Sequence, residues 1–206
     1  MGICYIVAAG DMYGKIPHVN DGDCIIVADG GYDHLRKFGI EADIIVGDFD
    51  SVENDFSGTD AIVHKHPTVK DDTDTMLAVK IGLEKGYTDF VIYGGVGGKR
   101  TDHTVANLQT LAFIAEKGAR GTLVGNGELF TVISNSDITI DGEKDSFFSV
   151  FAYGGIAKGV TIVGAHYDVQ NAELTPFFPL GVSNKFKENT VRVSVEKGCL
   201  MIVYNK

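Results

Sequence analysis

The chain has 206 residues, of which 44% are hydrophobic and 22% are charged, and its formal net charge is −10. These values are ordinary for a globular protein and exclude a largely disordered chain. The length accommodates one large domain or two small ones. No run of Lys and Arg is longer than two residues, whereas a nucleic-acid-binding protein usually presents a basic face. We therefore expect no nucleic-acid partner.

The cysteines and the first apolar run indicate a cytoplasmic protein. Cys4, Cys24 and Cys199 form no CxxC pair, so neither a zinc site nor a disulfide framework is indicated. The apolar run 3–9 is too short to span a membrane and does not have the layout of a signal peptide. We therefore expect reduced, buried thiols and no membrane partner.

Residues 1–124 alternate short apolar runs with stretches of helical character. The predicted strands are 3–8, 24–28, 43–46, 61–64, 90–93 and 122–124, and the predicted helices are 32–38, 73–84 and 101–117. Near-continuous apolar runs are typical of strands that are covered on both faces. Alternating strands and helices indicate a parallel sheet with right-handed crossovers. We therefore predict an α/β domain over residues 1–124.

The pattern changes after Gly-Asn-Gly at 125–127. The predicted strands there are 129–134, 138–140, 147–153, 160–163, 167–174, 190–195 and 200–204, with turns that include 141–142, 154–155 and 197–198. Short strands separated by turn residues, without amphipathic helices, are typical of all-β folds. We therefore predict a small antiparallel β-sandwich over residues 125–206.

Two acidic motifs follow predicted strands. G-D-F-D-S at 47–51 places Asp48 and Asp50 on one face of an extended chain, and Mg²⁺ typically takes one or two such carboxylates with water and phosphate oxygens. K-D-D-T-D at 70–74 opens a helix, with Asp71 and Asp74 three residues apart on one side. The alternatives are a strand-capping turn for the first motif and helix capping for the second.

A glycine-rich stretch, G-G-V-G-G-K-R-T-D-H at 94–103, connects a strand to a helix. Glycines let the backbone approach a phosphate, a helix N-terminus offers N–H groups, and Arg100 can bind phosphate with paired hydrogen bonds. The stretch is neither a Walker A loop nor a GxGxxG motif, and its alternative is a flexible turn. Asp102 and His103 stand where a helix cap is expected, and D-G-G at 29–31 could be a tight turn.

Four of these candidate sites lie on the carboxyl side of four predicted strands, 24–28, 43–46, 61–64 and 90–93. In an open parallel sheet, ligands bind beyond the carboxyl ends of the strands. Capping and turns alone do not readily account for this agreement, so we expect one shared site.

Taken in order, these motifs resemble those of the bacterial thiamine pyrophosphokinase family. Asn107 and G-V-S-N at 181–184 complete the resemblance, which extends along essentially the whole chain. It implies an enzyme that transfers the diphosphoryl group of ATP to the hydroxyethyl oxygen of thiamine, giving thiamine diphosphate and AMP. It also implies a homodimer, with each active site where the α/β domain of one subunit meets the β domain of the other.

The resemblance also assigns residues by motif. It implies that Mg²⁺ and the phosphates are held by the catalytic carboxylates Asp48, Asp50, Asp71 and Asp74. It places Asp29, Gly30, Arg100, Asp102 and His103 around the ATP, and Thr73, Ser183 and Asn184 in the substrate site. Some relatives place a Trp beside the thiamine rings. Because this chain has no Trp, Phe177, Phe178 and Phe186 are its aromatic candidates.

Three other functions fit parts of the pattern. D-F-D-S-V at 48–52 fits the DxDx[TV] motif of haloacid-dehalogenase-type phosphatases, with Asp48 as covalent nucleophile, although that family usually carries the motif after its first strand. A DxD-dependent glycosyltransferase would need an acceptor domain for which 206 residues leave little room. A non-catalytic thiamine or nucleotide sensor would be stabilised by its ligand without releasing AMP.

Overall fold

The structure is a computed structural model that describes residues 2–16, 19–47, 60–65 and 72–205. The chain divides into two compact units, Met1–Thr110 with Leu123–Asn126, and Leu111–Thr122 with Gly127–Lys206. Within the described ranges, no helix is both long and apolar enough to cross a membrane.

The first unit is built from parallel strands and helices, as the alternating pattern predicts. Its elements are β1 (Cys4–Val7), β2 (Cys24–Ala28), η1 (Asp29–Gly31), α1 (Tyr32–Phe38), β3 (Ile44–Gly47), β4 (Ile62–Lys65), α2 (Asp74–Glu84) and β5 (Asp89–Tyr93). Two further elements, α3 (Thr101–Glu116) and β6 (Arg120–Val124), pass from one unit to the other. Each predicted strand and helix of residues 1–124 is present, with ends shifted by at most two residues.

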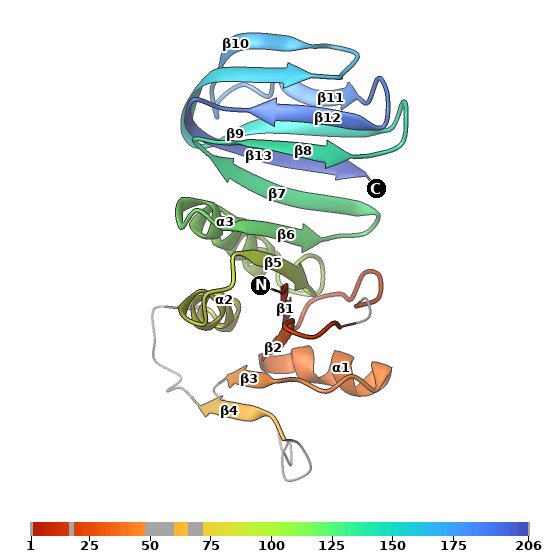
Figure 1. Cartoon of the computed structure of the whole chain (residues 1–206), viewed down its shortest axis with the longest axis vertical. Coiled ribbons are helices and arrows are strands. Elements are labelled where there is room, and N and C mark those ends of the chain that lie inside the picture. Colours follow the sequence, from red (N-terminus) through yellow and green to blue (C-terminus); the bar gives the residue numbers. More distant parts are fainter. Residues whose placement is uncertain (1, 17–18, 48–59, 66–71, 206) are drawn as a thin grey trace. The chain divides into compact units, whose positions relative to one another are not determined.

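The strands of this unit follow the order β4-β3-β2-β1-β5-β6 (Figure 1). The pairs from β4 to β5 are parallel. The chain builds outward from β1 to β4 and then returns to place β5 on the other side of β1. The order therefore reverses between β1 and β5, and ligands bind at such a reversal in open α/β sheets.

Helices cover both faces of this sheet, which explains why its central strands are continuously apolar. Leu35 of α1 packs in a cluster with Tyr5, Val7 and Ile25. On the opposite face, α2 approaches so closely that a Cβ built at Gly82 would lie 2.9 Å from the Sγ atom of Cys4. β1, β2 and β3 are buried along their whole length, as strands covered on both faces must be.

The second unit is antiparallel. Its strands are β7 (Glu128–Ser134), β8 (Asp137–Asp141), β9 (Phe147–Val163), β10 (Val169–Leu174), β11 (Gly181–Lys185), β12 (Thr190–Ser194) and β13 (Lys197–Asn205). The long β9 pairs with β11 and β13 over its first half and with β10 and β12 over its second (Figure 1). Side chains of both halves, such as Val150 and Ile162, share one core. The fold class, α/β followed by an antiparallel sandwich, is thereby confirmed.

The predicted turn at 154–155 is wrong, because β9 is one strand there. Gly154 has a φ of 71°, and β13 pairs Cys199 with Tyr153 but Lys197 with Lys158. The residues between Tyr153 and Lys158 therefore form a bulge, which needs an extra residue in an unusual backbone region. The glycines mark a bend through which β9 passes from one sheet to the other.

The segment 181–185 forms the strand β11, which is absent from the predicted set of strands. Gly181 pairs with Val150 and Asn184 with Phe148, with an irregularity between them where Ser183 has a φ of 60°. Nothing in G-V-S-N-K alternates as a strand should. Pairing with the exposed edge of β9, rather than intrinsic propensity, places this segment in the sheet.

Candidate active site

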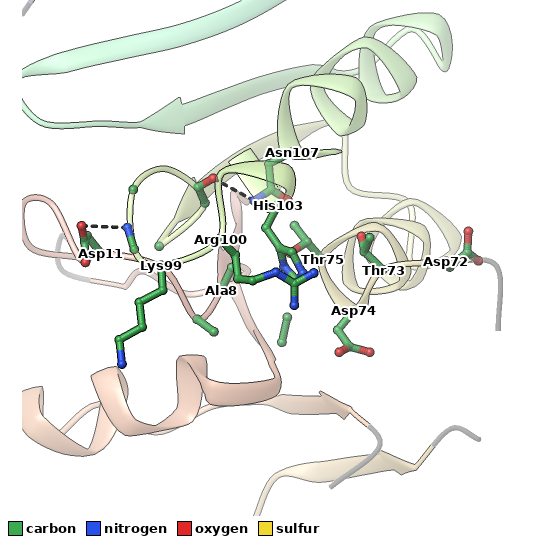
Figure 2. Close-up of a pocket in the computed structure, with 17 residues that line it drawn as sticks. Ala8, Asp11, Asp72, Thr73, Asp74, Thr75, Lys99, Arg100, His103 and Asn107 are labelled. Atoms are coloured by element: carbon green, nitrogen blue, oxygen red, sulfur yellow. Dashed lines mark hydrogen bonds between the residues drawn. The ribbon is translucent and has the colours of Figure 1, made fainter. Parts of the chain in front are cut away.

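A pocket of about 920 Å³ lies at the carboxyl ends of β1 and β5, where the strand order reverses (Figure 2). Its walls are residues 8–11 after β1, residues 94–95 and 97–100 after β5, residues 72–75 at the start of α2, and Ala28, His103 and Asn107. Ligand pockets usually measure about 300–1,000 Å³. The pocket therefore has room for a nucleotide.

The loops after β1 and β5 join into one floor. The N–H of Ala8 donates to the carbonyl of Tyr93 (2.8 Å), and the N–H of Gly10 donates to that of Gly94 (2.7 Å). Gly94 has a φ of 64°, and a Cβ there would lie 2.2 Å from the Ala8 carbonyl oxygen. Because any side chain would force these loops apart, glycine is required at this position.

Two side chains hold the glycine-rich loop, and a third holds the loop after β1. Buried Asn107 donates from Nδ2 to the carbonyl of Gly95 (2.8 Å), and Asp11 Oδ2 accepts the N–H of Gly98 (2.9 Å; Figure 2). His34 Nε2 lies 2.9 Å from the carbonyl oxygen of Gly10 and donates to it. The glycine-rich loop is thus fixed to α3 and to the loop after β1, which α1 holds in turn, and this does not fit the alternative of a flexible turn.

Basic side chains lie at the end of this loop. Figure 2 shows Arg100 and His103 facing the cavity opposite Asp74, and Lys99 also lines it. Exposed Asp102 does not line the pocket and instead accepts from Arg100 Nε at 2.9 Å and 3.2 Å. Its carboxylate orients the guanidinium. Basic side chains at the start of a helix such as α3 favour the binding of an anion.

The Arg100–Asp102 pair predicts that the carboxyl of Asp102 titrates at an unusually low pH. Hydrogen bonds from Arg100 lower the pKa of Asp102 to about 2. A carboxyl with a depressed pKa favours the folded state above its unfolded pKa of about 3.9, and this contribution is lost as the pH falls toward 2. An NMR titration should give a midpoint near pH 2, and Arg100→Gln should raise it toward the unfolded value. An unchanged midpoint in Arg100→Gln would contradict this cause, and the other carboxyls serve as internal controls.

The start of α2 contributes carboxylates. Thr73 Oγ1 accepts the N–H of Met76 (3.1 Å), so Thr73 is the N-cap of α2, and the capping alternative is confirmed for this residue. Asp72 is bound by Lys80 Nζ at 2.7 Å and 2.8 Å. Asp74 lies in the first turn and lines the pocket.

The other predicted metal ligands, Asp48, Asp50 and Asp71, lie outside the described residues. Within the described ranges, no three His, Cys, Asp or Glu side chains form a group able to hold a metal ion. The residues present still fit magnesium, which prefers carboxylate oxygens. Asp74 offers one at the pocket, and β3, which runs parallel to β2, ends at Gly47 on the same edge of the sheet.

D-G-G at 29–31 forms the 3-10 turn η1 between β2 and α1. Ala28, which lines the pocket, directly precedes it. A Cβ at Gly31 would lie 2.1 Å from the carbonyl oxygen of Val7, so this turn packs against the end of β1. For Asp29, the structure describes the backbone. A Cβ added at Gly30 would lie 3.2 Å from the side chain of Ala9, a pocket residue.

In the second unit, Asn184 holds the backbone of Tyr167. Its Oδ1 accepts the N–H of Tyr167 (3.2 Å) and that of Lys185 (2.8 Å), and its Nδ2 donates to the Tyr167 carbonyl (2.8 Å). Asn184 is buried, whereas the side chain it supports, Tyr167, is 72% exposed. Ser183 is also exposed, and its N–H donates to Ser149 Oγ (3.1 Å).

The aromatic candidates differ in accessibility. Phe186 is fully buried and packs edge-on against Phe148, with ring centroids 5.2 Å apart. Phe186 therefore cannot cover the thiamine rings, and its prediction as an aromatic candidate is wrong. Phe177 and Phe178 are exposed beside an apolar pocket of about 110 Å³.

Sequence reasoning missed the first loop of the pocket. Gly10 and Asp11 follow strand 3–8 just as Gly47 and Asp48 follow theirs, so the same signal could have found them. It also missed His34 and Tyr167. His34 binds the backbone of Gly10, and the backbone of Tyr167 is held by Asn184. Such contacts between distant segments cannot be seen in a single sequence motif.

A glycine-rich loop, basic side chains and the carboxylate of Asp74 line one pocket at the strand-order reversal, an arrangement typical of enzymes that bind phosphorylated substrates. Residues 17–122 match the family description "Thiamin pyrophosphokinase, catalytic domain", and residues 135–200 match "Thiamin pyrophosphokinase, vitamin B1 binding domain". The chain therefore belongs to the thiamine pyrophosphokinase family, as its motifs indicate. The position of D-F-D after β3, the third strand, also disfavours a haloacid-dehalogenase-type phosphatase.

Individual similar proteins carry the name of the same family. The thiamine pyrophosphokinase of Bacillus subtilis (strain 168) is 25% identical over 162 residues, covering 76% of this chain and 75% of that protein. The crystal structure of a thiamine pyrophosphokinase from Bacillus subtilis has a TM-score of 0.89 at 24% identity, covering 99% of both chains. That from Geobacillus thermodenitrificans has a TM-score of 0.85 at 22% identity, covering 99% of this chain and 97% of its own. These two likenesses show the fold.

Proposed function

We propose that this chain transfers the diphosphoryl group of ATP to the hydroxyethyl oxygen of thiamine, giving thiamine diphosphate and AMP. The observation that carries this proposal is the pocket at the strand-order reversal, most of whose lining residues lie in the part of the chain that matches the catalytic domain of the family. We assign catalysis and Mg-ATP binding to residues 1–124 and thiamine binding to residues 125–206.

On the nucleotide side, the glycine-loop N–H groups and Arg100 would bind the phosphate oxygens, with His103 and Lys99 beside them. Transfer of this kind depends on charge neutralisation and in-line positioning more than on a strong nucleophile. Asp102 keeps Arg100 oriented before the substrate arrives. Asp29 and Gly30 complete the nucleotide region in this proposal, next to pocket residue Ala28.

Magnesium would be held by the carboxylates Asp48, Asp50, Asp71 and Asp74. When bound, it supplies positive charge for the phosphate oxygens of ATP. One of the four carboxylates would accept the proton of the thiamine hydroxyl as its oxygen attacks. Thr73, as the N-cap, fixes the turn that presents Asp74 to the pocket.

On the thiamine side, we propose Tyr167 as an aromatic face for the ligand, with Asn184 positioning it and Ser183 nearby in the same motif. The apolar pocket beside Phe177 measures about 110 Å³, well below the usual range for a ligand site of about 300–1,000 Å³. A partner surface would therefore be needed to enclose thiamine. We therefore propose a homodimer in which the β domain meets the α/β domain of the other subunit, and we propose the cytoplasm as its location.

The thiamine assignment predicts a selective loss of affinity. Tyr167→Ala should weaken thiamine binding by about 1–3 kcal/mol, the cost of losing a stacked ring or an ordered polar contact, and should leave Mg-ATP binding unchanged. Phe177→Ala tests the alternative aromatic candidate, which is 91% exposed on the same unit, and it should leave thiamine binding unchanged if Tyr167 supplies the aromatic face. The measurement is calorimetric titration with each ligand. Equal losses for thiamine and nucleotide would mean that Tyr167 supports the fold instead.

A shared site predicts complementation between subunits. Mixing an Asp50→Asn chain with a Tyr167→Ala/Ser183→Ala chain should restore up to about a quarter of wild-type activity, because half of random dimers are mixed and each carries one intact site. The measurement is turnover after the two chains are unfolded and refolded together. A mixture no more active than its parents would place each site within one chain.

Product analysis tests the function. The purified chain incubated with Mg-ATP and thiamine should release thiamine diphosphate and AMP in equal amounts, and omission of thiamine should abolish AMP release. ADP as the main nucleotide product would contradict diphosphoryl transfer. Ligand-induced stabilisation without any AMP would indicate a sensor.

A further inference from the structure

Two thiols face each other at the end of the first sheet that is remote from the pocket. Cys4 and Cys24 are the first residues of β1 and β2 and are direct register partners. Neighbouring strands lie about 4.7–4.9 Å apart, and the Cα atoms of a disulfide usually lie about 4.4–6.8 Å apart. Both cysteines are free, and their thiols are hydrogen-bonded to each other. The pair is therefore close enough to form a bond with little movement of the backbone.

We propose that Cys4 and Cys24 form a redox-modification site, which a low-molecular-weight disulfide such as oxidised glutathione converts into an intramolecular disulfide bond. The proposal goes beyond the transfer reaction and does not depend on it. Neither thiol lines the pocket.

The two thiols have different roles in this reaction. Cys24 is 6% exposed and Cys4 is 0% exposed, so an oxidant reaches Cys24 first. The hydrogen bond from Cys4 lowers the pKa of Cys24, and the charge of Lys85 acts in the same direction, against the effects of burial and of Asp43. The same hydrogen bond raises the pKa of Cys4. Since the thiolate is the nucleophile, accessibility and acidity both select Cys24 as the attacking group.

The reaction balances as two exchanges. The Cys24 thiolate attacks one sulfur of the oxidant, which forms a mixed disulfide and releases the first small thiol. Cys4 then loses its proton and attacks Cys24 Sγ, which forms the Cys4–Cys24 bond and releases the second small thiol. Two electrons pass from the protein to the oxidant, and the protons of the two cysteines end on the two released thiols.

The bond would act on the strands that carry the pocket. Residues 8–9 follow β1, and Ala28 ends β2, whereas the two cysteines lie at the opposite ends of these strands. Closing a loop of about 20 residues restricts the unfolded chain and so stabilises the folded one. We expect oxidation to raise the melting temperature of the chain by several degrees without closing the pocket.

The test is oxidation of the full chain with oxidised glutathione, followed by alkylation in denaturant and peptide mass spectrometry. The expected product is a linked Cys4–Cys24 peptide, two hydrogen atoms lighter than the separate peptides, and dithiothreitol should reverse both the bond and the rise in melting temperature. Cys199→Ser, the control, should behave like the wild type. Cys4→Ser should accumulate glutathione on Cys24, whereas Cys24→Ser should leave Cys4 unmodified.

Three results would overturn the proposal. One is full alkylation of both cysteines after equilibration of the folded chain with the oxidant. Another is a glutathione adduct confined to Cys199. The third is a Cys4–Cys24 bond that forms in urea but not in the folded chain. Because the linked peptide is sought in the wild-type chain, these outcomes remain decisive even if a serine variant fails to fold.

Discussion

Replacing Asp48 or Asp50 by Asn should lower kcat by about 100-fold or more. Loss of one group that stabilises charge in the transition state typically has an effect of this size. The free energy of unfolding should stay the same or rise, because neighbouring carboxylates repel each other when no cation lies between them. The measurements are steady-state turnover at increasing magnesium concentrations and urea unfolding of each variant.

Asp60→Asn is the matched control for these variants. Asp60 is exposed and is assigned no role, so its replacement should leave turnover within about twofold of the wild type, as is usual for surface positions. An Asp48 or Asp50 variant with near-normal turnover at saturating magnesium would remove that residue from the proposed metal site.

Gly94→Ala should separate the two loops that form the pocket floor. The new Cβ would lie 2.2 Å from the Ala8 carbonyl oxygen, so the loops after β1 and β5 must move apart at the point where Gly10 donates to Gly94. We expect a loss of about 3–5 kcal/mol in the free energy of unfolding together with loss of nucleotide binding. Urea unfolding and titration with a non-hydrolysable Mg-ATP analogue measure the two effects.

Gly39→Ala separates this clash from simple backbone strain. Gly39 has the same φ, 64°, but a Cβ added there would have no atom of another described segment within 4 Å. Its replacement should cost the left-handed backbone penalty alone, about 1–2 kcal/mol, and should leave nucleotide binding intact. Equal destabilisation by the two substitutions would mean that the loops tolerate the extra carbon atom.

Much of the fold can be predicted because the local patterns are strong. The apolar runs of β1, β2 and β3 are buried on both faces, so their composition alone identifies them. The order of the strands is not predicted. It depends on which side of β1 the chain places β5, and the residues of either strand do not encode that choice in a readable pattern.

The errors lie where tertiary pairing outweighs local preference. Gly154 carries a turn signal, yet β9 continues through it as a bulge because both halves of the strand have partners. G-V-S-N-K at 181–185 carries no strand signal, yet it forms a strand because it pairs with the edge of β9. In both segments, hydrogen bonds to distant residues decide the backbone conformation.

The sequence motifs predict which residues line the candidate site better than they predict what each residue does there. Arg100, His103 and Asp74 do line one pocket, as the shared carboxyl edge of the strands indicates. The roles of Asp102 and Asn184 cannot be derived from sequence, since Asp102 holds Arg100 and Asn184 holds the backbone of Tyr167. Phe186 resembles a surface aromatic in sequence, but its ring fills the core of the sandwich.

The most direct test of diphosphoryl transfer follows the β phosphorus of ATP. Wild-type chain, magnesium and thiamine are incubated with ATP that is radiolabelled at this atom, and the products are separated by chromatography. A single transfer of the diphosphoryl group predicts that the label moves to thiamine diphosphate and that AMP is unlabelled. Label that remains in ADP, with unlabelled thiamine phosphates, would show transfer of single phosphoryl groups and would contradict the proposed reaction.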